Sequence, residues 1–448
     1  MNIKQLRQTI LDRAIRGQLV SQDPTDEPAS VLLERIRAEK EELIKEKKLK
    51  REKRDSQPIE EVPFEIPEGW VWCRLGDIAQ SNIGLTYSPN NVSINGTAVL
   101  RSNNIKDDKL LLNDLVRVSG DIQEKNYIKE GDILICARNG SRNLLGKSTI
   151  INNLEEPMTF GAFMAICRSL YNHWIFQTLR TDYFQRYLDF SNSTAINQIT
   201  QSMLLEFPIP LPPLKEQHRI VQKIEQLFAL VDIIEVNKKA LEKLIEQAKS
   251  QVLSDAVAGK LTHQDPNDEP AEELLKRIGK TTAPDTPYEK MLPKGWACTE
   301  MQVLCQLLDG KKKEGVLYPY LDVVFLRGKT EGSYKENGKY IPKNTHLILV
   351  DGENSGEIFT TTIEGYQGST LKILNISQEV NEQFIFYILR KEQKLFKESK
   401  TGSAIPHLNK KIFKELIVFL PPLAEQCRIV KKIETYFAAF DKIKYELI

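Results

Sequence analysis

The most regular pattern of apolar positions lies in the middle of the chain. Between Leu211 and Gly279, apolar residues recur at alternating four- and three-residue spacings, which is typical of the seam of a coiled coil. The seam positions are Ile220, Ile224, Leu227, Val231, Ile234, Leu241 and Ile245. Pro212 and Pro213 favour a helix start, and Gly259 favours a helix end. The pattern predicts about 45 residues of helix, roughly 65–70 Å long, and an amphipathic helix of this length needs a partner.

Two sequence blocks occur twice. The block Gln22–Ala29 reads QDPTDEPA and recurs as QDPNDEPA at Gln264–Ala271, 242 positions later (264 − 22). The block Leu211–Asp232 reads LPPLKEQHRIVQKIEQLFALVD and recurs as LPPLAEQCRIVKKIETYFAAFD at Leu420–Asp441, 209 positions later (420 − 211). A long internal repeat of this kind indicates an architecture with two related halves.

The order of the blocks predicts how the halves pair. In the middle of the chain the LPPL block leads directly into the QDP block, whereas at the chain ends the same element is split between tail and head. We therefore expect the head and the tail to form, together, the antiparallel partner of the central helix. The two termini would then meet, and a pseudo-two-fold axis would relate the halves. The alternative is a coiled coil between separate chains.

Two segments of mixed pattern lie between the repeats, and each opens with a Pro-x-Gly-Trp motif, at Trp70 and Trp296. Their strand-like runs are Thr97–Arg101, Asp132–Arg138, Lys147–Ile151, Val323–Leu326, Leu347–Val350 and Gly356–Thr361, and their helical runs are Asn172–Leu188 and Asn381–Ser399. We expect a mixed α/β (α+β) chain with two globular domains that contain twisted sheets. The expected segments are 1–57 and 212–280 (helical), 58–211 and 281–419 (globular), and 420–448 (helical).

Composition bounds the function. The formal net charge is +1, so a nucleic-acid partner would have to be held by local basic patches. Six dispersed cysteines without a Cys-x-x-Cys pair, and five dispersed histidines, predict reduced thiols and no metal site. No apolar run is long enough to span a membrane, and the charged N-terminus does not resemble a secretory signal, so we expect a cytoplasmic protein.

Polar loops that follow the predicted strands are candidate DNA readers. Arginine can bind guanine, and asparagine can bind adenine, through paired hydrogen bonds in the major groove. The candidates are Arg101, Asn103, Asn104, Arg138, Asn139, Ser141, Arg142, Arg327, Lys329, Asn354 and Ser355. Lys311, Lys312 and Lys313 are candidate phosphate contacts, although a solvated hairpin explains them equally well. Loops of this composition are also ordinary turns.

Catalytic motifs are not evident in the sequence. Gly140–Ser148 resembles a phosphate-binding loop, but its glycines are separated by five residues instead of four, and a strand-like run follows it. We therefore expect no catalytic residues. Two alternatives stay open: a stand-alone DNA methyltransferase or nuclease with an unrecognised catalytic centre, and a structural coiled-coil adaptor without a DNA role.

Taken together, the repeated blocks resemble the specificity subunits of type I restriction–modification systems. The resemblance covers essentially the whole chain and depends on the paired LPPLxEQxRIVxKIE blocks, the paired QDPxDEPA blocks and the Gly-Trp motifs at Trp70 and Trp296. It implies two target-recognition domains, each of which reads one half of a bipartite, asymmetric site in double-stranded DNA.

The resemblance also implies the partners. Two modification (methyltransferase) subunits would dock on the helices, and restriction subunits would join them in an endonuclease complex. S-adenosylmethionine, ATP and magnesium would be bound by those partner subunits, with no cofactor in this chain, which would be a non-catalytic subunit of an adenine methyltransferase. The helix pair would act as a ruler that sets the unread spacer between the two half-sites.

Overall fold

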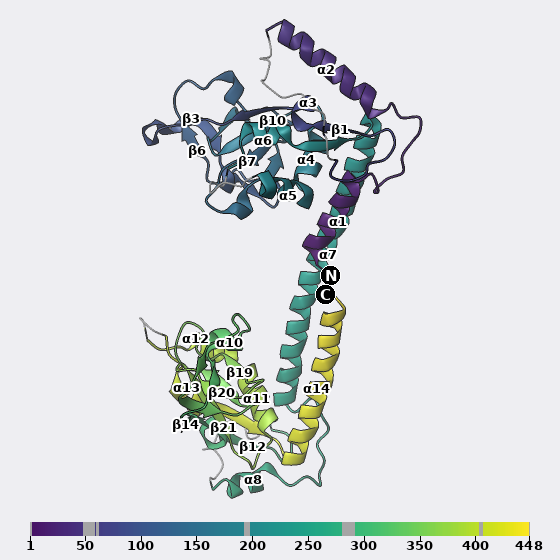
Figure 1. The fold of residues 1–448 in the computed structure, drawn as a ribbon. Coiled ribbons are helices and arrows are strands. Elements are labelled where there is room, and N and C mark those ends of the chain that lie inside the picture. The colour runs from purple at the N-terminus through teal and green to yellow at the C-terminus, as the bar shows by residue number, and fades with distance from the viewer. Residues whose placement is uncertain are drawn as a thin grey trace. The chain divides into compact units, whose positions relative to one another are not determined.

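A computed structural model gives the architecture, and it describes residues 2–47, 59, 62–191, 198–279, 292–402 and 406–447. By its contacts the chain divides into two units, residues 1–237 (unit 1) and 238–448 (unit 2). Each unit contains sheets and packed helices (Figure 1), so the predicted mixed α/β class with two sheet-rich domains is confirmed. The predicted segment boundaries at 57/58 and 280/281 lie outside the described residues.

Unit 1 contains a four-stranded and a three-stranded sheet, in the orders β2-β10-β7-β8 and β6-β3-β9. The strands are β2 (Gln80–Ile83), β3 (Val92–Leu100), β6 (Val116–Val118), β7 (Ile133–Cys136), β8 (Ser148–Ile150), β9 (Met158–Phe160) and β10 (Met164–Arg168). Two short pairs complete it: β1 (Val71–Arg74) with β11 (Pro208–Leu211), and β4 (Ile105–Lys106) with β5 (Lys109–Leu110). Strand β7 is buried at every position, which explains its continuous apolar run.

Helices carry much of the apolar core of unit 1. They are α1 (Ile3–Ile15), α2 (Ala29–Lys45), α3 (Leu75–Ile78), α4 (Asn172–Leu179), α5 (Asp182–Ser191) and α6 (Gln201–Glu206). The largest core cluster joins α1, α4 and the first part of α7 (Leu214–Val257), and includes the fully buried Ile15, Trp174 and Ile220. Trp174 Nε1 donates to the carbonyl of Pro210 at 2.9 Å. The indole N–H is therefore hydrogen-bonded although the side chain is buried in the core.

Unit 2 also contains two larger sheets, but its second sheet has five strands where that of unit 1 has three. Its sheets have the orders β13-β21-β18-β19 and β14-β17-β20-β15-β16, with the short pair β12-β22. The strands are β12 (Ala297–Glu300), β13 (Cys305–Leu308), β14 (Lys311–Lys313), β15 (Tyr318–Leu321), β16 (Tyr334–Lys335), β17 (Gly338–Ile341), β18 (His346–Leu349), β19 (Ile358–Thr360), β20 (Gly365–Gln367), β21 (Leu371–Ile376) and β22 (Ile417–Leu420). The helices are α8 (Ala271–Arg277), α9 (Met301–Leu304), α10 (Val323–Leu326), α11 (Glu382–Lys391), α12 (Gln393–Glu398), α13 (Lys410–Glu415) and α14 (Leu423–Glu446).

The predicted long helix is present as α7, which has 44 residues. Gly259 follows it with a φ of +70°, and Lys260 N donates to Asp255 O at 2.9 Å, which is the expected glycine-assisted helix end. Four seam residues are buried (Ile220, Ile224, Val231 and Ile245), and Leu227 and Leu241 are half-buried. Ile234 is 39% exposed, so it is less covered than the other seam residues.

Each unit supplies an antiparallel partner for its own part of α7. In unit 1, Arg7 of α1 pairs with Asp232, whereas Gln22, further along the chain, bonds to Glu216, earlier in α7. In unit 2, Lys249 pairs with Asp441 of α14 at 2.6 Å. Both partner helices are therefore supplied within the chain. The meeting of the two termini involves both units and stays a prediction.

Three predicted elements differ from the structure. Val323–Leu326 is a helix (α10) and not a strand, because the Asp322 side chain caps it by accepting from Phe325 N at 2.9 Å. The run Asn172–Leu188 is broken into α4 and α5, where Thr181 Oγ1 accepts from Phe184 N at 3.3 Å. The run Asn381–Ser399 is likewise broken into α11 and α12. Apolar runs this short do not distinguish a strand from a buried helix.

Candidate nucleic-acid interface

Three loops of unit 1 meet at one edge of its sheets. Strands β3 and β9 are parallel, so the turns that follow them lie together, and Gly161 N donates to Leu100 O at 3.0 Å. The loop after β7 joins them because the backbone N–H groups of Ala137 and Arg138 both donate to Phe163 O, at 2.9 and 3.0 Å. We call residues 101–104, 138–142 and 161–163 the unit 1 edge.

Two of the three arginines at this edge are paired with carboxylates. Arg101 contacts Asp114, at 3.7 Å from Nη2 to Oδ2, and Arg142 Nη2 lies 2.7 Å from Asp189 Oδ1. The guanidinium carbon of Arg138 instead lies 5.4 Å from the centre of the Phe163 ring. All three guanidinium groups are thus oriented by neighbours before any ligand binds.

The amides and the serine at the unit 1 edge have different surroundings. Asn104 is 1% exposed; its Oδ1 accepts from Arg101 N at 2.9 Å and its Nδ2 donates to Leu111 O at 3.0 Å. The prediction of Asn104 as a reader is therefore corrected, because its side chain holds the loop from inside. Asn103 and Ser141 are exposed, and Asn139 is half-buried and accepts from Ser141 N.

The corresponding edge of unit 2 forms in the same way. Strands β15 and β20 are parallel, and Gly368 N donates to Leu321 O at 3.1 Å. The loop after β18 joins them because Val350 N donates to Thr370 O at 2.8 Å, as Ala137 N donates to Phe163 O in unit 1. We call residues 322–329, 351–357 and 368–370 the unit 2 edge. Its chemistry differs from unit 1, since an Asp351–His407 contact of 2.7 Å lies where unit 1 has Arg138.

The predicted readers of unit 2 are only partly accessible. Asn354 and Lys329 are exposed, and both Nε and Nη2 of Arg327 bond to the carboxylate of Glu357. Ser355 has no exposed surface, and its Oγ donates to Gly352 O at 2.8 Å. Ser355 is therefore corrected from a reader to a residue that closes the loop.

The three candidate phosphate lysines lie on β14, one of the two outer strands of the five-stranded sheet. Lys311 and Lys312 are exposed. Lys313 is held internally, because its Nζ donates to Tyr318 Oη at 2.7 Å and lies 4.2 Å from the centre of the Tyr340 ring. Sequence reasoning missed these tyrosines, although aromatic residues at alternate strand positions were the available signal.

The repeated sequence blocks meet inside each unit at a buried carboxylate. In unit 1, Glu216 of the LPPL block is 1% exposed and accepts from Trp70 Nε1 at 3.0 Å and from Gln22 Nε2 at 3.1 Å. Burial raises the pKa of the Glu216 carboxyl, and the hydrogen bonds from Trp70 and Gln22 oppose that rise. We call this group the unit 1 joint.

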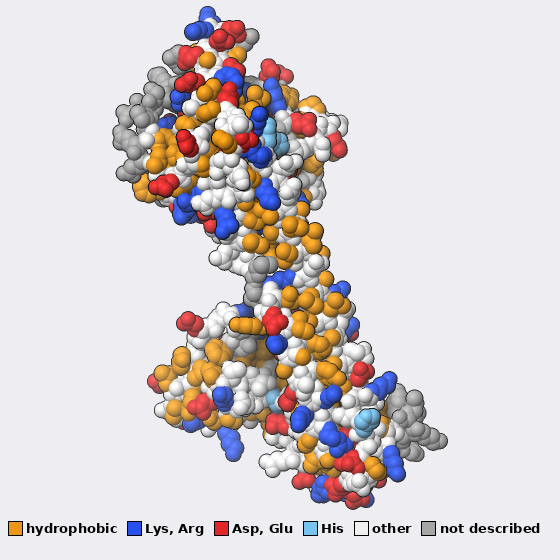
Figure 2. Space-filling model, turned by 90° about the vertical axis from the view of Figure 1, so that its right-hand side faces the viewer, with side chains coloured by type: hydrophobic (Ala, Val, Ile, Leu, Met, Phe, Trp, Pro, Cys, Tyr) orange, Lys and Arg blue, Asp and Glu red, His pale blue; other side chains and the backbone are white. Residues whose placement is uncertain are grey.

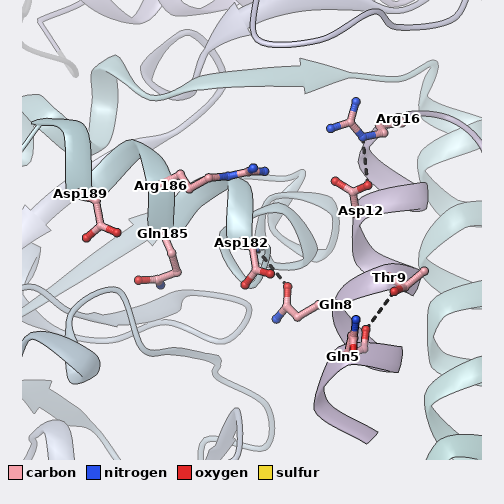
Figure 3. A pocket seen from close by; sticks show the side chains of 9 residues that line it. All are labelled: Gln5, Gln8, Thr9, Asp12, Arg16, Asp182, Gln185, Arg186 and Asp189. Atoms are coloured by element: carbon pink, nitrogen blue, oxygen red, sulfur yellow. Dashed lines mark hydrogen bonds and ion pairs between the residues drawn. The ribbon is translucent and has the colours of Figure 1, made fainter. Parts of the chain in front are cut away.

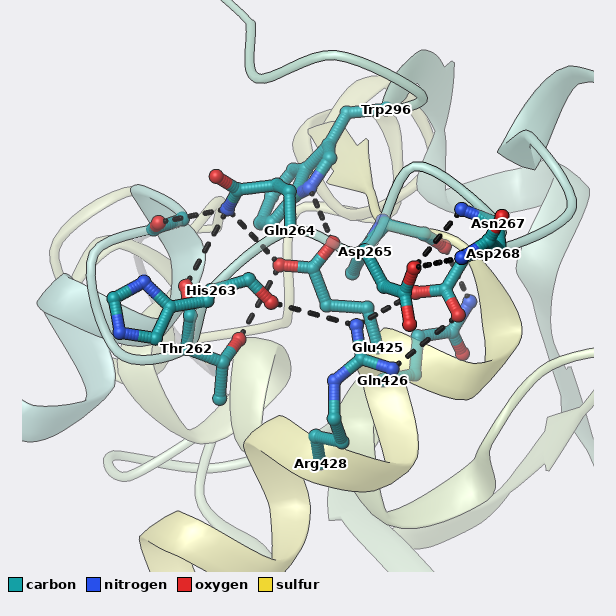
Figure 4. Close-up of polar contacts among 12 residues, drawn as sticks. Thr262, His263, Gln264, Asp265, Asn267, Asp268, Trp296, Glu425, Gln426 and Arg428 are labelled. Atoms are coloured by element: carbon teal, nitrogen blue, oxygen red, sulfur yellow. Dashed lines mark hydrogen bonds and ion pairs between the residues drawn. The ribbon is translucent and has the colours of Figure 1, made fainter.

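Unit 2 builds the same joint (Figure 4). Glu425, which has no exposed surface, accepts from Trp296 Nε1 at 3.0 Å and from Gln264 Nε2 at 3.1 Å. Beside it, Arg428 pairs with Asp268 at 2.6 Å, as Arg219 pairs with Asp26 at 2.7 Å in unit 1. The repeats are thus explained as a structural joint between each sheet-rich domain and its helices.

Close packing at the joint also explains the repeated glycines. Gly17 has a φ of +66°, and a Cβ built there would lie 2.3 Å from Pro67 Cγ; at Gly259 the equivalent contact with Pro293 would be 2.6 Å. A side chain at either position would therefore clash with the Pro-x-Gly-Trp motif.

A polar cleft of about 630 Å³ lies between α1 and α5 (Figure 3). Gln8 joins the two sides, because its Nε2 donates to Arg180 O at 3.0 Å and its Oε1 accepts from Asp182 N at 3.1 Å. Asp189, which lines the cleft, is also the partner of Arg142. The cleft therefore adjoins the unit 1 edge.

Other sites are not evident in the described part of the chain. Among the residues with assigned positions, no group of His, Cys, Asp and Glu could hold a metal ion, and no helix is long and apolar enough to cross a membrane. Gly140–Ser148 leads through a short 3₁₀ turn into strand β8, so it lacks the helix that a phosphate-binding loop requires.

Comparison with known proteins identifies the family. The sequence model of the type I restriction modification DNA specificity domain matches residues 67–243 and 305–448, so the chain belongs to this family. The EcoAI specificity subunit of Escherichia coli is 27% identical over 552 aligned positions, which cover 99% of this chain and 90% of that protein. The EcoEI specificity subunit of Escherichia coli is 26% identical, with 99% and 91% covered.

Solved structures share the fold. A chain from a study of complex assembly and conformational transition of the type I restriction–modification system has a TM-score of 0.62 and 19% identity, covering 86% of this chain and 96% of that one. The HsdS subunit from Thermoanaerobacter tengcongensis has a TM-score of 0.51 and 19% identity, with 86% and 95% covered. The chain is thus a type I specificity subunit by family, and it shares the fold of these solved structures.

Proposed function

We propose that each unit of this chain reads one half of a bipartite, asymmetric site in double-stranded DNA. The observation that carries this proposal is that each unit has such an edge. In each unit, equivalent strands end at that edge, but the side chains of the loops there differ between the units. Unit 1 offers Arg138, Asn139 and Ser141, and unit 2 offers Asn354 and Lys329. Equal scaffolds with unequal polar loops suit two different half-sites.

Lys311 and Lys312 are proposed to contact the phosphate backbone. Both are exposed on an outer strand, where a ligand as large as a duplex can approach them. Such contacts add affinity without base specificity. They also supply locally the positive charge that the whole chain, at a net charge of +1, does not have.

The helices are proposed to set the spacer and to bind two modification subunits, with restriction subunits joining the complex. Figure 2 shows hydrophobic side chains gathered along the helices. In unit 1, Leu230, Ile233 and Val236 of α7 are more than half exposed, and in unit 2 so is Leu244. Exposed apolar residues at helical spacing are typical of a surface that a partner covers. S-adenosylmethionine, ATP and magnesium are proposed to bind to those partners.

The test compares the chain alone with the assembled complex. The purified chain, incubated with DNA, S-adenosylmethionine and magnesium, should neither methylate nor cut. Co-expressed with its modification subunits, it should direct adenine methylation to one split motif, mapped by methylome sequencing. Methylation or cutting by the chain alone would favour a stand-alone enzyme, and an assembled complex that does not bind DNA would favour a structural adaptor.

A further inference from the structure

One aromatic ring at the unit 1 edge is exposed where its neighbours are buried. Phe163 is 59% exposed on the turn between β9 and β10, whereas Phe160 and Met164, at the ends of those strands, are 0% and 1% exposed. A single exposed apolar residue is common on protein surfaces, so the exposure of Phe163 gains its meaning from the side chain beside it on the same edge, Arg138.

The backbone that carries this ring is held in place. Phe163 O accepts hydrogen bonds from the N–H groups of both Ala137 and Arg138, and Met164 N donates to Gly161 O at 2.8 Å, which closes the turn. Because the turn is fixed before binding, little conformational entropy is lost when the ring meets a ligand.

The partner of this ring is Arg138, which differs from the other candidate arginines. Arg101, Arg142 and Arg327 each pair with a carboxylate. In the described part of the chain no ion pair is found for Arg138, whose guanidinium lies over the Phe163 ring and whose side chain is exposed. A cation–π contact with a ring face orients a guanidinium and leaves N–H groups for hydrogen bonding to a base.

From this arrangement we propose that Arg138 and Phe163 form a composite reader for a guanine next to a thymine. The Arg138 guanidinium would bind O6 and N7 of guanine, and the Phe163 ring would contact the C5-methyl group of the adjacent thymine. Two adjacent side chains, a guanidinium and the ring beneath it, suit two neighbouring bases, which are about 3.4 Å apart along each strand. The inference rests on the proposed function, since it names the base step that unit 1 reads.

Unit 2 provides an internal contrast. The equivalent turn, between β20 and β21, is Gly368-Ser369-Thr370 and carries no aromatic residue. In this turn, Ser369 N donates a hydrogen bond to Tyr320 Oη at 3.0 Å. The composite reader is therefore specific to the half-site that unit 1 reads.

The test is a selection from random duplexes with the full chain assembled with its modification subunits. Two pools are used, one containing thymine and one with deoxyuridine in its place, which lacks only the methyl group. For the unchanged chain we expect one half-site to contain a guanine–thymine step. Replacing that thymine with deoxyuridine should weaken binding about fourfold, which is the change in affinity expected for the loss of one buried methyl group. Phe163→Ala should abolish this difference, and Phe163→Leu should keep part of it.

Two further variants separate the contributions. Arg138→Ala should lower the preference for the adjacent guanine roughly tenfold. Leu170→Ala is the matched control, because Leu170 is 91% exposed beyond the other end of β10, and it should leave every base preference unchanged.

The outcomes are distinguishable. A unit 1 half-site without a guanine–thymine step, or a deoxyuridine effect that survives in Phe163→Ala, overturns the composite reader and leaves the proposed function intact. An assembled complex that selects no split site overturns the proposed function itself, and the composite reader with it.

Discussion

Trp70 Nε1 donates a hydrogen bond of 3.0 Å to Glu216 Oε2, and the two residues come from sequence blocks 146 positions apart. Trp296 and Glu425 repeat the bond at the same length in unit 2. A buried carboxylate is stable only when its oxygens are hydrogen-bonded, so each joint needs all three blocks at once. This requirement gives a physical reason for the repeats, independent of any ligand.

The first prediction concerns the joint. Glu216→Gln preserves the size of the side chain but turns an NH₂ group toward one of the two donors, Trp70 or Gln22. We expect the free energy of unfolding of unit 1 to fall by about 1–3 kcal/mol. Hydrogen exchange of unit 1 amides measures it, and Glu225→Gln, at an exposed position of the same helix, is the control. Equal effects of both substitutions would contradict the role of the joint.

The second prediction concerns pH. The pKa of Glu216 is raised in the folded chain, so between its unfolded value, near 4.5, and the raised value the folded state binds more protons. The contribution of this group to stability should therefore increase as the pH falls through that window. Urea unfolding at several pH values would show it as a pH-dependent difference between the unchanged chain and Glu216→Gln. A difference independent of pH would contradict it.

The third prediction concerns the carboxylate at Arg327. Glu357→Gln should release Arg327 from its ion pair and so strengthen non-specific DNA binding. The gain in affinity should be at most about fivefold, because such an ion pair is worth at most about 1 kcal/mol. Fluorescence anisotropy measures the affinity. Glu353→Gln removes the same charge from the same loop, and no described residue forms an ion pair with Glu353. If both variants gain equally, the effect is one of net charge and not of the pair.

The fourth prediction concerns the exposed lysines. Lys311→Ala and Lys312→Ala should weaken binding to all sequences alike, and each should reduce the slope of log K against log salt by about 0.9. Lys313→Ala should leave the slope unchanged, because its ammonium group is already bound to Tyr318. Affinities measured across a salt series decide this. A change in base preference without a change in slope would instead make these lysines base readers.

The fifth prediction tests the helix ruler. Insertion of one helical turn within Leu241–Ala248 adds about 5.4 Å, which corresponds to one or two base pairs. We expect the unread spacer to lengthen by that amount while both half-sites keep their sequences. The same insertion in the exposed loop 119–121, outside α7, is the control and should leave the spacer unchanged. Methylome sequencing that finds altered half-sites with the original spacing would contradict the ruler.

Sequence patterns predicted the parts of the fold that periodicity and repetition determine. The seam from Ile220 to Ile245 located α7, and Gly259 marked its end, because a long helix with one apolar face has a distinctive period. The short run Val323–Leu326 was assigned wrongly, since its helix depends on one capping bond from Asp322. The helix breaks at Thr181 and Glu392 also depend on local contacts, which the spacing of apolar residues does not reveal.

The interface was predictable only as a group of loops. Arg138 and Arg142 were identified by residue type, but burial decides that Asn104 and Ser355 face inward, and burial depends on how distant strands meet. Phe163 was missed because a phenylalanine beside apolar strand residues resembles core. The joint was visible only as repeated letters, since the bond between Trp70 and Glu216 requires the folded chain.

The most direct test of the central claim exchanges one unit's recognition segment. Residues 58–211, which include the unit 1 edge, would be replaced by the equivalent segment of a related specificity subunit, and the methylome of cells that express the hybrid with its modification subunits would be sequenced. The account predicts a motif with one new half, one original half and the original spacer. A motif in which both halves change, or neither, would contradict it.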